Sequence, residues 1–349
     1  GCKNETTGNS DIQRQSYVSP SADSAYFQEI GAQIGLNFNH SIGGNELKNI
    51  IESVGGGAAF LDYDNDGYLD IYACSGIWIE GFSKSDKPEK RTGNKLYRNR
   101  QDGTFEDVTE KANVAGPWYS MGVSVADYNN DGFSDLFLSN YGRNTLLENN
   151  GDGTFVDRSK DSGLEGGMEC SVGATWLDYD NDGLLDLYVG NYLNFDPDYK
   201  YYYAPDGFPG PLAYDAQPDH LYHNLGDGSF EEVTQEMGIS DLDGRAMGVG
   251  SADYDHDGHM DICVANDHTV NYMWHNDQGK GFTDLATLSG TGFSQAGEAT
   301  VSMSVDYADY NKDELLDIFI SDDNYCSLYE NMGNGVFRDN SYASGISVA

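Results

Sequence analysis

Basic residues are scarce in this sequence. The chain has 19 Lys and Arg against 58 Asp and Glu, which gives a formal net charge of -39 at pH 7. Nucleic acid and anionic lipid would both repel such a chain, so neither is expected as a partner. An acidic composition can indicate disorder, but 38% hydrophobic and 13% aromatic residues are enough to form a core. The acidity therefore indicates a demand for cations.

Cysteines are few, and long apolar runs are missing. The five cysteines include no Cys-x-x-Cys pair, which argues against a zinc ribbon and a c-type haem site. No run of about 18 apolar residues occurs, so no membrane-spanning helix is expected. Two alternatives stay open for Cys74, Cys170, Cys263 and Cys326: disulfide pairing in an oxidising compartment, or burial as small apolar side chains.

The first cysteine has a different setting. Gly1 and Cys2, followed by the polar stretch 3–15, resemble the start of a mature bacterial lipoprotein, in which the cysteine carries the lipid. We interpret residues 1–24 as a flexible tether and residues 25–349 as a single domain. A lipid on Cys2 would anchor the protein to a bacterial outer membrane, on an extracytoplasmic side that the sequence does not specify further. The alternative is an ordinary cysteine.

Motifs of common catalytic sites are also missing. The sequence has no Gly-x-Ser-x-Gly, no His-Glu-x-x-His and no phosphate loop. His220 and His223 lie three residues apart on an expected strand, so they point to opposite faces and cannot jointly hold a metal. His268 and Glu298 are the remaining candidates for acid–base chemistry.

One nine-residue pattern, in contrast, occurs five times. It places oxygen-bearing side chains at positions 1, 3, 5 and 9 and a backbone carbonyl at position 7, the ligand set that a hard cation such as Ca²⁺ prefers in a tight loop. In chain order, the residues at positions 1, 3, 5, 7 and 9 are Asp62, Asp64, Asp66, Tyr68 and Asp70 (loop 1); Asp127, Asn129, Asp131, Phe133 and Asp135 (loop 2); Asp178, Asp180, Asp182, Leu184 and Asp186 (loop 3); Asp253, Asp255, Asp257, His259 and Asp261 (loop 4); and Asp309, Asn311, Asp313, Leu315 and Asp317 (loop 5).

The repetition favours metal sites over solvated turns, which is what a single Asp-x-Asp-x-Asp-Gly segment often is. Neighbouring carboxylates repel each other by roughly 3 to 4 kcal/mol per pair unless a cation lies between them. An EF-hand is excluded, because its bidentate Glu at position 12 is replaced by Ala73, Leu138, Val189, Val264 and Ile320. We predict up to five Ca²⁺ ions.

The five loops are not expected to be equivalent. Loop 2 has Asn129 in place of one carboxylate, and loop 5 has Asn311. Loop 5 also replaces the glycine at position 6 by Glu314, and a residue with a side chain resists a positive φ. Loop 5 is therefore predicted to bind the ion most weakly. His256 and the side chain of His259 are interpreted as spectators.

The loops belong to a larger repeating unit. Residues 121–159 contain four short apolar or alternating segments bounded by Gly, Asn or Asp, a pattern typical of four antiparallel strands. The first loop aspartates recur at positions 62, 127, 178, 253 and 309, a spacing typical of propeller blades. The sequence predicts an all-β propeller with five complete four-stranded blades. An extra strand in residues 27–36 would close the ring, cover an edge or join another subunit.

These segments resemble a known family. The loops, together with Leu96-Tyr-Arg-Asn99, Leu221-Tyr-His-Asn224 and the Gly-Asp-Gly-Thr/Ser-Phe segments at 151–155 and 226–230, are similar to the VCBS or FG-GAP repeats of CRTAC1-like proteins. The resemblance covers residues 27–346. It implies a calcium-binding β-propeller of extracytoplasmic proteins, related in design to the integrin α-subunit head. Integrin-type propellers have seven blades, whereas five are counted here.

Two long insertions are predicted on the face opposite the metal loops. The first contains Trp78 and Phe82 beside the basic residues Lys84, Lys87, Lys90 and Arg91, and the second contains Tyr199, Tyr201, Tyr202, Tyr203, Phe208 and Tyr214. Aromatic side chains are favoured at protein interfaces and on sugar-binding platforms. The alternative is that they pack over their own blades.

These features together favour a non-catalytic binding or scaffold subunit in a membrane-associated protein complex. The alternatives are a calcium-dependent glycan-binding adhesin or lectin, and a polysaccharide lyase.

Overall fold

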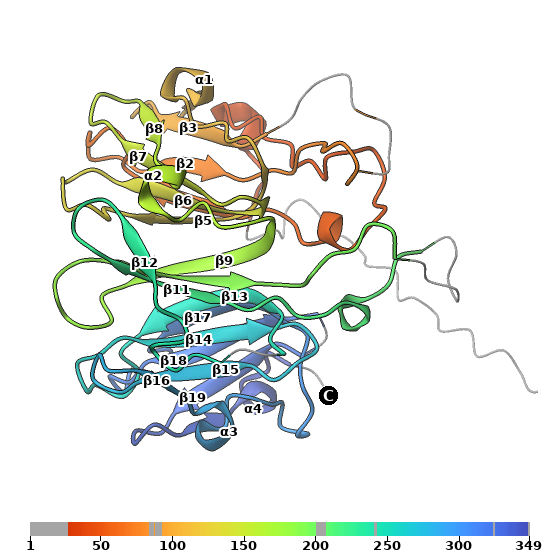
Figure 1. Ribbon diagram of the computed structural model, residues 1–349, viewed down its shortest axis with the longest axis vertical. Helices are drawn as coiled ribbons and strands as arrows, with labels where there is room; N and C mark the ends of the chain where they lie inside the picture. The colour runs from red at the N-terminus through yellow and green to blue at the C-terminus, as the bar shows by residue number, and fades with distance from the viewer. Residues whose placement is uncertain are drawn as a thin grey trace, which may run out of the picture.

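The computed structural model describes residues 27–83, 87, 93–199, 207–240, 243–323 and 325–347 (Figure 1). The described residues form three four-stranded sheets and one eight-stranded sheet, which together contain five groups of four consecutive strands, called blades 1 to 5 here. Blade 1 comprises β1 (Ala58–Leu61), β2 (Asp70–Ala73), β3 (Lys95–Asn99) and β4 (Phe105–Asp107); blade 2 comprises β5 (Tyr119–Ala126), β6 (Asp135–Gly142), β7 (Thr145–Asn149) and β8 (Phe155–Asp157); blade 3 comprises β9 (Glu169–Leu177), β10 (Asp186–Asn191), β11 (His220–Asn224) and β12 (Phe230–Glu232); blade 4 comprises β13 (Ala246–Ala252), β14 (Asp261–Asn266), β15 (Tyr272–Asn276) and β16 (Phe282–Asp284); blade 5 comprises β17 (Ser302–Ala308), β18 (Asp317–Asp322), β19 (Ser327–Asn331) and β20 (Phe337–Asp339).

Short helices and turns complete the blades. A four-residue helix follows the fourth strand of four of them: α1 (Thr109–Ala112), α2 (Ser159–Ser162), α3 (Ala286–Ser289) and α4 (Ser341–Ser344). Single-turn 3-10 helices span Gly31–Ile34, Ile51–Ser53 and Pro211–Ala213. No helix in the described ranges is long and apolar enough to cross a membrane. Cys2, residues 1–24, Tyr201, Tyr202, Tyr203, Lys84, Lys90 and Arg91 lie outside the described residues.

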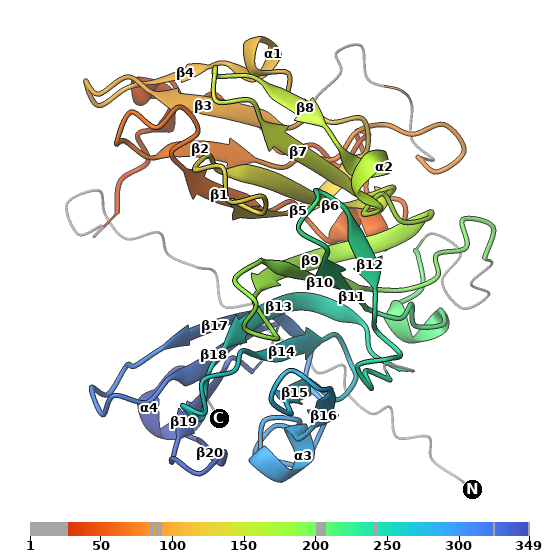
Figure 2. The same cartoon turned by 60° about the vertical axis from the view of Figure 1, so that its left-hand side comes forward.

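Strands that follow one another in sequence are antiparallel neighbours in every blade, as the repeat predicts. Blades 2 and 3 are also joined edge to edge, because Tyr141 and Gly142 at the end of β6 pair with Cys170 and Glu169 at the start of β9. The blades fan out from their first strands, as Figure 2 shows. The propeller-like all-β architecture with five four-stranded blades is therefore confirmed.

The second strands of blades 2, 3 and 4 pack on both sides. In β6, Leu136 and Leu138 belong to a core cluster shared with blade 1, whereas Phe137 between them belongs to a cluster shared with blade 3. Alternate side chains of a strand point to opposite faces. A strand between two neighbouring blades must therefore be apolar at every position, which explains the continuous apolar runs in the sequence.

The first strands of all five blades surround a central hollow with a volume of about 500 Å³. Glycines let these strands approach closely. A Cβ atom on Gly122 would lie 2.3 Å from the carbonyl oxygen of Val172, and one on Gly248 would lie 2.6 Å from the Cα of Ser304. Only glycine allows backbones to meet at this distance.

The N-terminal segment differs from its prediction. Residues 27–30 form no strand, and the side chain of Phe27 is 93% exposed. A fourth strand needs a third strand to pair with, and none of the described strands pairs with residues 27–30. The turn that follows is nevertheless in place, because Gly35 packs directly on the carbonyl oxygen of Phe105 in β4.

The described cysteines are unpaired. Cys74, Cys170 and Cys263 are buried, and Cys326 is partly buried. Burial raises the pKa of the Cys170 thiol to about 12, so this group is an apolar filler rather than a nucleophile. Of the two alternatives from the sequence, burial as small apolar residues is the one that these side chains adopt.

Candidate metal centres

Each repeated loop connects the first strand of a blade to its second strand, and all five share one hydrogen-bond pattern. In loop 3, the carboxylate of Asp178 accepts hydrogen bonds from the backbone N–H groups of Asp182 and Gly183, at 3.0 and 2.9 Å. The same two bonds occur in loops 1, 2, 4 and 5, at 2.8 to 3.0 Å. The N–H at position 7 donates to the carboxylate at position 5, as from Leu184 to Asp182 at 2.8 Å. The backbone thus curls around the loop interior with its carboxylates fixed.

The aspartate at position 9 is buried in every loop and begins the second strand. Asp186 is 0% exposed. It accepts hydrogen bonds from the backbone N–H groups of Tyr179 in its own loop and Asn224 in β11, at 3.1 and 2.8 Å. Burial raises the pKa of Asp186 to about 6 and that of Asp135 in loop 2 to about 7. Without a cation, these carboxylates hold protons close to neutral pH.

The donor set fits a hard divalent cation. In loops 1, 3 and 4, groups of three ligand atoms lie within 4.8 Å of one another, including those of Asp62, Asp64 and Asp66. The Oδ1 atom of Asp64 is buried and has no hydrogen-bond partner, which is costly unless an ion satisfies it. Several of the predicted clusters therefore have the geometry to hold metal ions.

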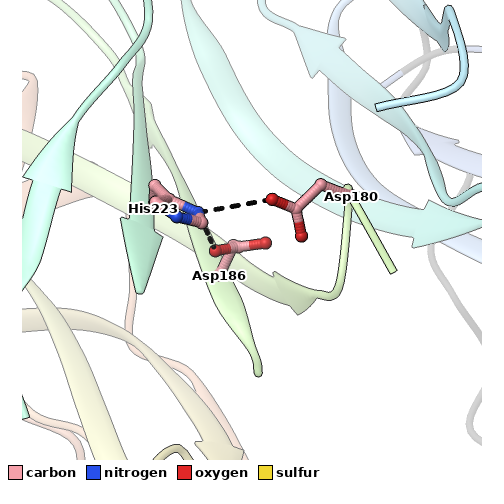
Figure 3. A group of neighbouring side chains, drawn as sticks. All are labelled: Asp180, Asp186 and His223. Atoms are coloured by element: carbon pink, nitrogen blue, oxygen red, sulfur yellow. Dashed lines mark hydrogen bonds and ion pairs between the residues drawn. The ribbon is translucent and has the colours of Figure 1, made fainter. Parts of the chain in front are cut away.

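The third strand places one further residue beside each metal loop, which was not predicted from the sequence. In blade 3, Nδ1 of His223 lies 3.1 Å from Asp186 and 3.8 Å from Asp180, as Figure 3 shows. His275 holds the same place in blade 4, at 3.1 Å from Asp261 and 3.6 Å from Asp255. The separate environment of His220, whose Nε2 lies 3.4 Å from Glu169, agrees with the prediction that His220 and His223 do not share a metal.

In blade 1, arginine holds the place of these histidines. Nε of Arg98 donates to Asp64 at 2.6 Å, and Nη2 donates to Asp66 at 3.1 Å. Hydrogen bonds from Gln101 and Arg98 lower the pKa of Asp66. The guanidinium group of Arg98 thus places a positively charged side chain beside the carboxylates of loop 1.

The two loops that have Asn at position 3 carry glutamate at this place instead. Glu148 in blade 2 accepts hydrogen bonds from Tyr128 Oη at 2.8 Å and from Arg158. Glu330 in blade 5 accepts one from Arg338 at 2.6 Å. The third-strand residue is therefore cationic or imidazole where position 3 is Asp, and anionic where position 3 is Asn. The sequence does indicate where this residue lies: in each blade it directly precedes the Asn that ends the third strand.

Loop 5 accommodates its substitutions. Glu314 adopts φ 71°, and Lys312 at position 4 adopts φ 66°. Glu314 thus takes the left-handed conformation that the sequence reading expected it to resist, and its N–H still bonds to Asp309 at 3.0 Å. The conformation is reached at a cost in strain, of order 1 kcal/mol for a residue with a side chain.

Asparagine side chains tie adjacent blades together at this end of the molecule. Nδ2 of Asn224 in blade 3 donates to the carbonyl oxygen of Tyr128 in blade 2 at 2.9 Å. Asn149, Asn276 and Asn331 make the same bond to the preceding blade, each at 2.8 Å. Because the acceptors lie inside the metal loops, loops 1 to 4 are each held both by their own blade and by the next one.

The two insertions emerge at the opposite end of the blades, as predicted. Most of their described aromatic residues are not on the surface. Phe82 is 4% exposed and stacks on Tyr141 with ring centroids 4.5 Å apart, and Tyr214 is 7% exposed. Phe208 packs against the same apolar cluster. For these residues, the alternative of packing over the blades holds. Tyr199 remains 44% exposed.

A second hollow of about 450 Å³ lies beside this cluster and shares Val54, Met247 and Met303 with the central hollow; it is called the channel-mouth hollow here. Its lining includes Asp267, His268 and Asp323, together with Tyr192 and Phe208. Asp267 is 4% exposed and holds both Tyr192 Oη and His268 Nδ1 at 2.6 Å. Glu298, the other acid–base candidate, is exposed and does not line this hollow. The structure therefore separates the two candidates and keeps only His268 at a concave site.

Comparisons with known proteins identify the same repeated segments. The chain matches the FG-GAP-like repeat family over residues 62–138, 127–189, 206–264 and 253–320. A stretch of 89 residues, 25% of this chain, is 35% identical to human cartilage acidic protein 1 and covers 14% of that protein. The Xenopus tropicalis protein of the same name is 36% identical over 72 residues, 20% of this chain and 11% of its own length. The chain thus matches only a small part of these relatives.

Solved structures with a similar fold include the Agrocybe aegerita lectin that recognises non-reducing terminal N-acetylglucosamine, with a TM-score of 0.47 and 16% identity over 81% of this chain and 65% of that chain. The V. cholerae biofilm matrix protein Bap1 has a TM-score of 0.42 and 11% identity over 80% of this chain and 38% of that chain.

Proposed function

Because this chain belongs to the FG-GAP-like repeat family, we propose that it is a calcium-stabilised propeller that acts as a non-catalytic binding or scaffold subunit. The observation that carries the proposal is the difference between the two ends of the blades. One end repeats a metal loop with the same hydrogen bonds in all five blades. The other end is different in each blade and holds the channel-mouth hollow.

Calcium is the ion that the loops favour. Their donors are carboxylates and carbonyl groups, which suit Ca²⁺ better than softer metals. Buried position-9 aspartates such as Asp135 and Asp186 lie at the junction of loop and sheet, so an ion there stabilises the fold rather than a reacting group.

Metal content and stability test the calcium part. Native mass spectrometry of the protein in calcium should show several bound ions, and dialysis against EDTA should lower the unfolding midpoint. The variant Asp182→Ala should lose one ion, whereas Asp152→Ala, in the turn between β7 and β8 and outside the metal loops, should lose none. Unchanged metal content in Asp182→Ala, or no response to EDTA, contradicts the proposal.

The binding part concerns the channel-mouth hollow. We infer that a protein partner inserts a polar or cationic side chain here, because Asp267 and Asp323 give the hollow a negative charge beside the apolar surface of Phe208. The paired variant His268→Asn and Asp323→Asn should weaken co-purification of a stoichiometric partner from native membranes. Asn tolerates the left-handed backbone of His268, which has φ 60°. A matched control, Lys280→Asn outside the hollow, should retain the partner.

A glycan is the alternative ligand, because carboxylates next to an aromatic ring also suit sugar hydroxyls and ring faces. Binding to a glycan array that His268→Asn abolishes would favour a lectin or adhesin. Cleavage of an acidic polysaccharide with the same sensitivity would favour a lyase, with the Asp267–His268 pair as its base.

Attachment to an extracytoplasmic membrane surface through a lipid on Cys2 is part of the same proposal. It places the partner in a membrane-associated complex. Mass spectrometry of the N-terminal peptide from natively purified protein tests it, because an unmodified Cys2 would contradict lipid anchoring without affecting the calcium or binding parts.

A further inference from the structure

The channel-mouth hollow brings two thioether side chains together with a histidine. Met247 of β13, Met303 of β17 and His268, which follows β14, all line it. The proposed protein partner requires the carboxylates and Phe208 of this hollow but neither sulfur atom. Two thioether sulfurs and one imidazole nitrogen are donors that a soft metal ion prefers.

β-Bulges direct the two methionines to the channel. The pairing of β13 with β14 skips Met247, and the pairing of β17 with β18 skips Met303. A bulge leaves one residue out of the hydrogen-bonded ladder and re-aims its side chain. Both methionines line the central hollow as well as the channel-mouth hollow. The two bulges thus place both side chains where the hollows meet.

The strands that carry these methionines are in close contact. A Cβ atom on Gly248, directly after Met247, would lie 2.6 Å from the Cα of Ser304, directly after Met303. The backbones of β13 and β17 therefore meet next to the two bulges. Methionine has three rotatable side-chain bonds and adapts its shape to its surroundings. Its sulfur can therefore turn toward an ion that both strands share.

Packing alone does not require methionine at the bulge. In blade 3, the pairing of β9 with β10 skips Val172, which lines the central hollow at the equivalent position. A branched aliphatic side chain thus fits this place. Met121 holds it in blade 2 and lines the central hollow but not the channel-mouth hollow. The two blades that border His268 both have a thioether there.

His268 is oriented as metal-binding histidines are. Its Nδ1 lies 2.6 Å from Oδ1 of Asp267, whose Oδ2 accepts a hydrogen bond from Tyr192 Oη at 2.6 Å. Because a carboxylate only accepts, Nδ1 carries the imidazole proton and Nε2 keeps its lone pair. Histidines that bind metals almost always donate their other ring N–H to a carboxylate or a carbonyl group. Asp267 is 4% exposed, whereas the His268 side chain is 43% exposed.

The backbone of His268 is fixed as well. It adopts φ 60°, and its N–H donates to the carbonyl oxygen of Thr300, just before β17, at 3.0 Å. A non-glycine residue in this conformation is strained and persists only where its surroundings hold it, which is common at ligand sites. The bond to Thr300 keeps the histidine next to the strand that carries Met303.

We propose that Met247, Met303 and His268 bind a soft metal ion, Cu(I), in the channel-mouth hollow. Thioether ligands select Cu(I), whereas Ca²⁺ prefers oxygen. Asp267 and Asp323 line the same hollow and attract cations to it. The inference goes beyond the proposed function, because it requires neither a protein partner nor calcium in the loops.

Titration of the purified, calcium-loaded full chain with Cu(I) held by the chelator bicinchoninate tests the proposal. Thiolates also bind Cu(I), so Cys2→Ser and Cys326→Ser are present in every protein; Cys74, Cys170 and Cys263 are buried. The chain should take one ion from the chelator. No uptake of copper overturns the proposal.

Variants of the three ligands locate the ion. Met247→Leu, Met303→Leu and His268→Asn should each lower the Cu(I) affinity at least ~tenfold. Leucine nearly keeps the volume of methionine, and asparagine tolerates a positive φ. The matched control is Met168→Leu, at a 62% exposed methionine outside the hollow, which should bind as the parent does. Unchanged affinity in all three ligand variants, or an equal loss in the control, overturns the proposal.

X-ray absorption at the copper edge provides the second readout. The loaded chain should show two sulfur ligands and one imidazole nitrogen, and a shell without sulfur overturns the proposal. This measurement needs no ligand variant, so it decides the question even if one fails to fold. Met303→Leu leaves the charge of the hollow unchanged. It should therefore lose copper and still co-purify with the proposed protein partner, which separates the two proposals.

Discussion

The two ends of the blades differ in how closely the five blades repeat one another. At the loop end, all five blades repeat one set of backbone hydrogen bonds to a position-1 aspartate. At the opposite end, blades 1 and 3 carry long insertions whose aromatic residues share one core cluster. Repetition at one end indicates a structural role that every blade shares. Divergence at the other end indicates a surface that is specific to this protein. Variants at each end test this difference.

Removing the metal should give the largest effect, because it acts on every loop at once. Each site held at a hundredfold excess of calcium over its dissociation constant contributes about 2.7 kcal/mol to the free energy of unfolding. The unfolding midpoint in EDTA should therefore fall well below that in calcium, by thermal melting monitored with circular dichroism. Equal midpoints would mean that bound ions do not contribute to the stability of the folded protein.

The pH dependence of the metal-free protein should have an unusual sign. Burial raises the pKa of Asp135 and Asp261 to about 7, from an unfolded value near 4, so the folded state binds protons that the unfolded state releases. In EDTA, the free energy of unfolding should fall as the pH rises from about 4 to about 7. In calcium this loss should disappear, because the ion stabilises the ionised carboxylates. Urea titrations at several pH values measure both trends.

At the opposite end, Phe82→Ala should be the most damaging single change. Phe82 is 4% exposed and contacts Tyr119, Tyr141 and Phe195. Removing a buried phenyl ring typically costs about 3 to 5 kcal/mol. The matched substitution Tyr199→Ala, at 44% exposure, should cost less than ~1 kcal/mol. Denaturant unfolding compares the two, and similar losses would contradict the separation of core from surface in the insertions.

The asparagine links should give a smaller, graded effect. Asn276→Ala removes the bond to Tyr179 in blade 3 as well as the bonds to Met260 and from the Gly279 N–H in its own blade, and should cost about 1 to 3 kcal/mol. Asn99→Ala removes only bonds within blade 1, to Leu69 and from the Gln101 N–H, so it should cost less. An equal cost for both variants would mean that the bond between blades contributes nothing.

The smallest expected effect concerns loop 5. Glu314→Gly relieves a side chain from φ 71° and should stabilise the protein by about 1 kcal/mol. It should also raise the calcium affinity of this loop. Gly183→Glu, the reverse change in loop 3, should lower both quantities. Calorimetric titration with calcium measures the affinities, and no difference between Glu314→Gly and the parent would remove the reason for ranking loop 5 last.

The sequence predicted the parts of this protein that are repeated. Nine-residue spacing located every metal loop, and turn residues around 121–159 indicated four strands per blade. The aromatic insertions were left between two alternatives, since composition does not tell whether Phe82 points to solvent or into a cluster. The third-strand residues Arg98, His223 and His275 were missed, because they lie 34, 37 and 14 residues in sequence from the loop aspartates that they contact and meet them only across the sheet.

The N-terminal segment shows the limit of pattern matching. Its Phe27-to-Leu36 stretch has the signature of a fourth strand and its turn, yet only the turn forms. A strand depends on hydrogen bonds to a neighbour, which no local signature supplies. The turn depends on Gly35 reaching Phe105, and that contact is available.

The sequence by itself determined the loops and the four-stranded blades, because these depend on local spacing and on the turn residues between consecutive segments. Tertiary structure alone decided which side chains are covered: it buried Phe82 and Tyr214, brought Tyr192 to Asp267 at the channel mouth, and left Tyr310 exposed where Tyr128 is core. Burial depends on what the neighbouring blade presents. That information is spread over residues far apart in the chain, and it appears only when the blades are side by side.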